Sequence, residues 1–174
     1  MTTSARRVDY ISCCAWIGFF IEVIKNKGVK VIALTASYTG SIKAIDDMGN
    51  WRIKTLRDLG YDFTGAFPNV NRKVFTNFPE VNGDHPRFDQ GIIFVNGGAD
   101  MYTKGDVLNA FFLYSRFVPK KVLFVDDRYS NLEAVEKALP EGVEFIGFHY
   151  TGGAFYKGEA ISKEVFKASW EALQ

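Results

Sequence analysis

The sequence contains little cysteine and no excess of charge of either sign. Its only two cysteines, Cys13 and Cys14, are neighbours, which excludes a disulfide framework and favours a reducing compartment. The 21 basic and 20 acidic side chains leave a net charge of +1, so the composition does not favour a nucleic-acid partner. We therefore expect a cytoplasmic protein that does not bind nucleic acid.

The sequence also lacks a long hydrophobic run. The longest, residues 11–24, is shorter than the ~20 residues that a membrane helix needs, and Glu22 interrupts it, so we expect no membrane span. Arg6 and Arg7 precede this run as they would in a signal peptide, which leaves secretion as an alternative. Asp9 and the absence of a clear small-residue cleavage site argue against secretion.

The apolar content is sufficient for one domain with a substantial core. The chain has 174 residues, of which 47% are hydrophobic, and its 16 phenylalanines predict a phenylalanine-rich core. We expect a single domain over residues 1–174. Residues 61–90 hold three of the five prolines and are predicted to be loops that form a small cap or insertion, with one hairpin near residues 72–78.

Strand and helix patterns alternate along the chain. Continuous apolar runs predict buried strands, and apolar residues at helical spacing between capping residues and glycines predict helices. Strands that alternate with helices indicate an α/β fold with a mainly parallel sheet covered on both faces. The predicted strands are 29–34, 91–95, 121–125 and 143–148, and the predicted helices are 13–27 (ending at Gly28), 50–60 (capped by Asn50, stopped by Gly60), 103–117 (capping box Thr103 and Asp106), 130–139 (capping box Ser130 and Glu133) and 162–173.

Side chains that could do chemistry follow three of the predicted strands. Because right-handed crossovers place the ends of parallel strands along one edge, where ligands bind, we expect these side chains to lie there together. Taken singly, the threonine also fits an ordinary turn residue and the lysine a solvated surface residue. The side chains are Thr35 and Ser37, then Lys104, then Asp126 and Asp127.

The adjacent aspartates are the strongest of these signals. Successive strand residues point to opposite faces, so one aspartate could face a site while the other accepts backbone N–H groups. Two carboxylates this close repel each other unless a cation is near, and Mg²⁺ takes one or two carboxylates together with phosphate oxygens. Thr35, Lys104 and a helix N-terminus would hold a phosphate. Together these residues predict a phosphoryl-transfer site.

The order of these residues excludes several other phosphate-binding classes. In receiver domains the acidic pair comes first, whereas here Thr35 and Lys104 precede Asp126 and Asp127. The sequence contains no G-x-x-x-x-G-K-[ST] loop and no G-x-G-x-x-G that opens a helix, so P-loop and dinucleotide-binding fingerprints are both absent.

The ordered set resembles the haloacid dehalogenase (HAD) superfamily. The stretches "VIALTAS", "TKGDVLNAF" and "LFVDDRYSNL" are similar to its motifs II, III and IV. More narrowly, roughly residues 17–153 resemble an uncharacterised bacterial HAD-like family. The resemblance implies a Rossmann-like three-layer sandwich and a Mg²⁺-dependent phosphatase that acts on a small phosphorylated substrate, with residues 61–90 as its cap.

The resemblance also implies roles for individual residues. It implies phosphate binding by Thr35, Ala36 and Lys104, and metal binding by Asp126 and Asp127. Contacts to the substrate are implied for Ser37, Asn131 and His149.

The nucleophile motif of that superfamily, D-x-D-x-T on a central first strand, is missing. The only acidic residues before Thr35 are Asp9 and Glu22, and neither stands in such a motif, so we identify no catalytic residue. Two hypotheses remain open: a phosphatase or the larger part of one, and a catalytically inactive module that binds a phosphorylated ligand or a protein partner. A sheet without its central strand exposes pairing edges, which leads us to expect a homodimer.

Overall fold

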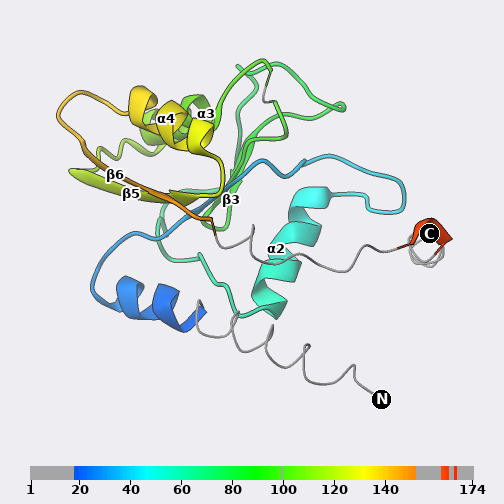
Figure 1. Ribbon diagram of the computed structural model, residues 1–174, viewed down its shortest axis with the longest axis horizontal. Helices are drawn as coiled ribbons and strands as arrows, with labels where there is room; N and C mark the ends of the chain where they lie inside the picture. The colour runs from blue at the N-terminus through cyan, green and yellow to red at the C-terminus, as the bar shows by residue number, and fades with distance from the viewer. Residues whose placement is uncertain (1–17, 99, 152–161, 165–166, 168–174) are drawn as a thin grey trace.

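The computed structural model is a mixed α/β fold, and it describes residues 18–98, 100–151, 162–164 and 167 (Figure 1). The α/β prediction is confirmed at this level. No helix within these ranges is long and apolar enough to cross a membrane. Besides a helix over residues 18–26, the elements are β1 (Ala33–Thr35), α2 (Met48–Asp58), β2 (Lys73–Val74), β3 (Arg87–Asp89), β4 (Ile92–Phe94), α3 (Lys104–Ser115), β5 (Lys121–Asp126), α4 (Tyr129–Ala138) and β6 (Glu144–His149).

The described strands form two separate sheets instead of the one mainly parallel sheet that the sequence predicts. Four strands lie in the order β1-β4-β3-β2, in which only β1 and β4 are parallel, and β5 and β6 form a parallel pair. The antiparallel pairing follows from a two-residue turn between β3 and β4. Gln90 and Gly91 have φ angles of 50° and 80°, and two left-handed residues are what such a hairpin turn requires.

The first strand is shorter and less buried than predicted. The apolar run 29–34 predicts a fully buried strand, but β1 covers only Ala33–Thr35, and all three residues are half-buried. Among the described strands β1 has a single neighbour, β4, which explains its partial burial.

The start of α3 is confirmed and the start of α2 is corrected. Thr103 accepts a hydrogen bond from the Asp106 N–H, and the Asp106 carboxylate accepts one from the Thr103 N–H, which is the predicted capping box. Asn50 was predicted to cap α2, but the N-cap is Asp47, whose carboxylate accepts a hydrogen bond from the Asn50 N–H. Gly60, with a φ of 83°, follows the end of α2 as predicted.

The capping box predicted for α4, Ser130 with Glu133, is wrong. The N-cap is Arg128, and no side chain makes a capping hydrogen bond there. The turn before α4 is held instead by Asp126, whose carboxylate accepts a hydrogen bond from the Arg128 N–H at 2.9 Å. The turn before α4 is therefore stabilised by Asp126, the last residue of β5, and not by Ser130 of α4 as the sequence predicts.

Two predicted helices lie partly outside the described residues. Of the predicted helix 13–27, residues 18–26 are described and helical, and Gly28 follows with a φ of 77°. The predicted helix 162–173 lies mostly outside the described residues, as do Asp9, Cys13 and Cys14.

The core is built largely from phenylalanine, as the composition predicts. Phe88 of β3 packs on Phe111 of α3 with ring centroids 4.5 Å apart, and Phe67 stands edge-on to Phe111 at 4.9 Å. Partly buried Val122 and Phe124 of β5 pack against the same cluster. Helix α3 therefore contributes to a core that contacts both sheets.

The segment 61–90 takes part in the four-stranded sheet. Of the hairpin predicted near residues 72–78, the structure has one strand there, β2, and it pairs antiparallel with the distant β3 and not within that stretch. Lys73 lies opposite Phe88 and Val74 opposite Arg87 in this pairing.

A buried ion pair joins this segment to α2. Arg87 of β3 is 1% exposed, and its two terminal nitrogens donate to the two carboxylate oxygens of Asp47 at 2.9 and 2.6 Å. Because Asp47 caps α2, the pair fixes the start of that helix against the sheet. Gly49 leaves room for the guanidinium, since a Cβ there would lie 1.9 Å from Arg87 Nη2.

We predict that Gly49→Ala destabilises the protein, although glycine to alanine within a helix is ordinarily favourable by roughly 1 kcal/mol. The new methyl group would displace the Arg87 guanidinium from Asp47, and such overpacking costs about 1–3 kcal/mol. Urea denaturation measures the change. The double variant Gly49→Ala/Arg87→Ala should lose less free energy of unfolding than the two single variants lose together, because the alanine methyl group no longer meets a guanidinium. Losses that simply add would contradict the proposed clash.

Candidate functional site

Asp126 ends β5 as a buried carboxylate with three protein donors. The side chain is 4% exposed and its Oδ2 accepts a hydrogen bond from Lys104 Nζ at 2.6 Å. Its Oδ1 accepts from the Arg128 N–H at 2.9 Å and from Asn131 Nδ2 at 2.8 Å. The site thus combines the last residue of β5, the first residue of α3 and a residue of the first turn of α4.

The partners of Asp126 keep its carboxylate ionised. Burial by itself raises the pKa of Asp126, but the hydrogen bonds from Lys104, Asn131 and the Arg128 N–H, with the charge of Lys104, outweigh burial and hold the pKa below its ordinary value. The Lys104 side chain is 13% exposed, so the ammonium is itself largely removed from solvent. This is a preorganised, neutral pair at the strand end.

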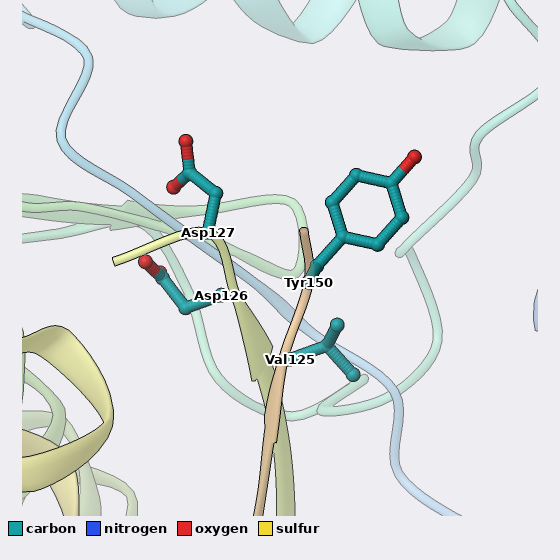
Figure 2. A pocket seen from close by; sticks show the side chains of 4 residues that line it. All are labelled: Val125, Asp126, Asp127 and Tyr150. Carbon is teal, nitrogen blue, oxygen red and sulfur yellow. The ribbon is translucent and has the colours of Figure 1, made fainter. Parts of the chain in front are cut away.

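Asp127 lies in a different environment from its neighbour. Its side chain is exposed and lines an open hollow of about 330 Å³ together with Val125, Asp126 and Tyr150. Figure 2 shows the Asp126 and Val125 side chains on opposite sides of the strand, with the Asp127 and Tyr150 side chains above them in this view. The two aspartates therefore offer one buried, neutralised carboxylate and one accessible carboxylate.

Two tyrosines beside the carboxylates, Tyr150 and Tyr129, were not predicted from the sequence. The Tyr150 N–H donates to the Asp126 carbonyl at 2.8 Å, which extends the β5–β6 pairing and brings Tyr150 to the hollow. His149, predicted as a substrate contact, lies opposite Asp126 in register, and its Nε2 is 3.1 Å from the Asp127 carbonyl oxygen. The Tyr129 ring stands edge-on to His149 at 6.1 Å. The register of β5 and β6 brings these rings together, and that register is visible only in three dimensions.

Thr35, Ala36 and Ser37 lie at the end of β1, which belongs to the other sheet. The Thr35 hydroxyl is 3.2 Å from the Ser37 hydroxyl and also accepts a hydrogen bond from the Ser37 N–H. Arg52 of α2, which the sequence analysis missed, donates from Nε to the Ser37 hydroxyl at 3.2 Å. In the part of the chain that the structure describes, no hydrogen bond joins this group to Lys104 or Asp126.

The donor set at the end of β5 is compatible with a hard cation. Asp126 and Asp127 supply only oxygen ligands, which Mg²⁺ prefers, and Mg²⁺ commonly keeps several waters beside one or two carboxylates. Within residues 18–98, 100–151, 162–164 and 167, no group of three or more His, Cys, Asp or Glu side chains is gathered for a metal. Any ion held here would therefore have few protein ligands.

Comparison with known proteins assigns the family. Residues 15–174 match the family described as "Protein of unknown function (DUF2608)". The chain belongs to this family.

Relatives of the family member described here occur in Rickettsia. The chain is 27% identical over 135 residues to an uncharacterized protein of Rickettsia bellii and 26% identical over 135 residues to one of Rickettsia felis, each match covering 75% of this chain and 45% of the relative. The chain thus spans about half the length of the curated relatives that it matches. No solved structure matches.

We predict that Lys104→Met destabilises the protein by about 3 kcal/mol, because it leaves the buried Asp126 carboxylate without its cation. Thermal or urea denaturation measures the loss. Adding Asp126→Asn to Lys104→Met should recover part of it, since the remaining amide is uncharged. Lys137→Met, an exposed position on α4, is the matched control and should change the free energy of unfolding by no more than about 0.5 kcal/mol.

The lowered pKa of Asp126 predicts a pH dependence of stability. A carboxyl whose folded-state pKa lies below its unfolded value of about 3.9 contributes stability above that value, and this stability is lost as the pH falls through the folded-state pKa. The difference in free energy of unfolding between the wild type and Asp126→Asn should therefore be constant near neutral pH and shrink below about pH 4. Urea titrations at a series of pH values measure this, and a difference that stays unchanged in acid would contradict it.

Proposed function

We propose that the chain carries the phosphate- and metal-binding part of a Mg²⁺-dependent phosphomonoester hydrolase with a Rossmann-like, HAD-like arrangement. The observation that supports this most directly is the buried Lys104–Asp126 pair beside the exposed Asp127 carboxylate. A fixed ammonium and an accessible carboxylate at one strand end provide a phosphate contact and a cation contact within one site.

Lys104 is the residue proposed to bind the phosphate. Its ammonium is held at the strand end by Asp126 and is a compact point charge suited to a phosphoryl oxygen. The N-terminus of α3 itself is occupied by the Thr103 and Asp106 capping box, so the lysine side chain supplies the positive charge there, without help from the helix end. Thr35 would add a hydroxyl only if the end of β1 approached the end of β5.

Asp127 is proposed as the main protein ligand of Mg²⁺, with the more buried Asp126 carboxylate next to it. The Oδ1 of Asp126 already accepts two hydrogen bonds and its Oδ2 accepts one, so the accessible carboxylate is that of Asp127. When bound, the ion would neutralise charge on a phosphoryl oxygen. Val125 and Tyr150 would limit water on one side of the hollow.

One observation favours the second candidate, an inactive module that binds a phosphorylated ligand or a protein partner. The Asp126 carboxylate accepts three hydrogen bonds from protein donors and is neutralised by Lys104, so it acts first as a structural group. Such a site could bind an anion through Lys104 without supplying a nucleophile.

The hydrolase candidate predicts Mg²⁺-dependent hydrolysis of p-nitrophenyl phosphate, with turnover reduced about a hundredfold or more in Lys104→Met because one charge-stabilising contact is lost. Calorimetric titration with Mg²⁺ and with inorganic phosphate accompanies the assay, and Asp127→Asn should abolish the Mg²⁺ signal. Lys137→Met and Glu141→Gln, both exposed, are matched charge controls and should behave as the wild type.

The outcomes separate the two candidates. Phosphate binding that depends on Lys104 but comes without turnover would favour the inactive module over the hydrolase. Absence of both turnover and phosphate binding would contradict the hydrolase and the ligand-binding form of the module.

A further inference from the structure

Among the described strands, β5 pairs with β6 along one edge only, and its other edge is open. The Glu144 N–H donates to the Lys120 carbonyl and the Tyr150 N–H donates to the Asp126 carbonyl, so the even-numbered residues of β5 direct their backbone groups toward β6. Lys121, Leu123 and Val125 therefore direct their N–H and C=O groups to the opposite edge. Among the described strands, none pairs with that edge.

Within the part of the chain that the structure describes, the same residues form an exposed apolar face of the pair. Side chains alternate along a strand, and Val122 and Phe124 pack into the core beneath α3 and α4. Leu123 and Val125 point the other way and are 61% and 54% exposed. Figure 1 shows α3 and α4 together on one side of β5 and β6. Since parallel strands are ordinarily covered on both faces and extended by further strands, this edge is an incomplete surface.

We propose that a second copy of the chain completes this surface, with β5 pairing antiparallel to the partner's β5 about a two-fold axis at Phe124. In that register Leu123 lies opposite the partner's Val125, and Lys121 lies opposite the partner's Asp127. Both apolar residues then have apolar neighbours, and both charged residues have neighbours of opposite charge. The edge is self-complementary, which a two-fold interface requires.

Other registers lose this complementarity. A shift of the two-fold axis to Leu123 keeps the outward backbone groups paired but places Lys121 opposite the partner's Val125. Asp127 then faces the partner's Pro119, which has no N–H to donate. The charges thus select the register centred on Phe124.

The pairing brings a residue of one copy into the site of the other. Lys121 lies opposite Glu144 of β6, and its ammonium pairs with that carboxylate at 2.8 Å on the same exposed face as Leu123 and Val125. In the dimer it would also stand beside the partner's Asp127, the accessible carboxylate at the strand end. The pairing depends on the open edge and its charges, and no phosphate takes part in it.

Charge reversal tests the register. Light scattering coupled to size exclusion, over a dilution series, should show a dimer for the wild type. In a Glu144→Gln background, which removes the partner of Lys121 on β6, Lys121→Glu and Asp127→Lys should each weaken the dimer about tenfold or more, because each replaces two cross-strand attractions by two repulsions. Combining Lys121→Glu with Asp127→Lys in that background should restore the dimer. Lys137→Glu is the matched control, because it reverses the charge of an exposed lysine on α4, away from the open edge, and it should leave the dimer intact.

A proline at the edge tests the pairing itself. The Leu123 N–H points away from β6, so Leu123→Pro should abolish the dimer while the monomer keeps its circular dichroism spectrum. Phe124→Pro, one residue on, removes an N–H directed toward β6 and should unfold the pair. A wild type that is monomeric throughout the dilution series, a dimer unaffected by Leu123→Pro, or a charge-reversed pair that fails to restore association would each overturn the proposal.

Discussion

The buried carboxylate of Asp126 is the constraint on which the arrangement of the second half of the chain depends. It accepts hydrogen bonds from Lys104 on α3, from Asn131 on α4 and from the backbone at Arg128. A carboxylate removed from water without such partners costs several kcal/mol, so the fold is stable only where both helices reach the end of β5. Gly105 permits this approach, because a Cβ there would lie 2.1 Å from the Ala134 carbonyl oxygen of α4.

The two adjacent aspartates have divided roles because of strand geometry. Asp126 turns toward α3 and α4 and is satisfied there, while Asp127 stays exposed at the hollow. A buried ion pair of this kind adds little net stability compared with apolar residues of the same volume. Its consequence is that the Lys104 ammonium is held at a fixed position at the end of β5, next to the exposed Asp127.

Local signals in the sequence predicted the elements whose stabilising contacts lie within a few residues. The Thr103–Asp106 capping box located the start of α3, and the apolar runs located β4, β5 and β6. Predictions failed where the stabilising partner is remote or belongs to another element. Asp47 rather than Asn50 caps α2 in contact with Arg87, which is 40 residues away, and Ser130 is not used as a cap because Asp126 already binds the turn.

The candidate site was also predictable only where its contacts follow from local sequence patterns. Lys104 and Asp126 meet as the strand–helix pattern predicts, and Asn131, implied only as a substrate contact, binds Asp126 instead. Thr35 does not join them, because β1 pairs with β4 in the four-stranded sheet while β5 pairs with β6. Tyr150 reaches the hollow through the register of β5 and β6, which no local pattern encodes. The alternation that buries Asp126 also exposes Val125, so the apolar wall of the hollow and the uncovered face of β5 are one surface. Whatever covers that face therefore also sets the polarity around the Asp127 carboxylate.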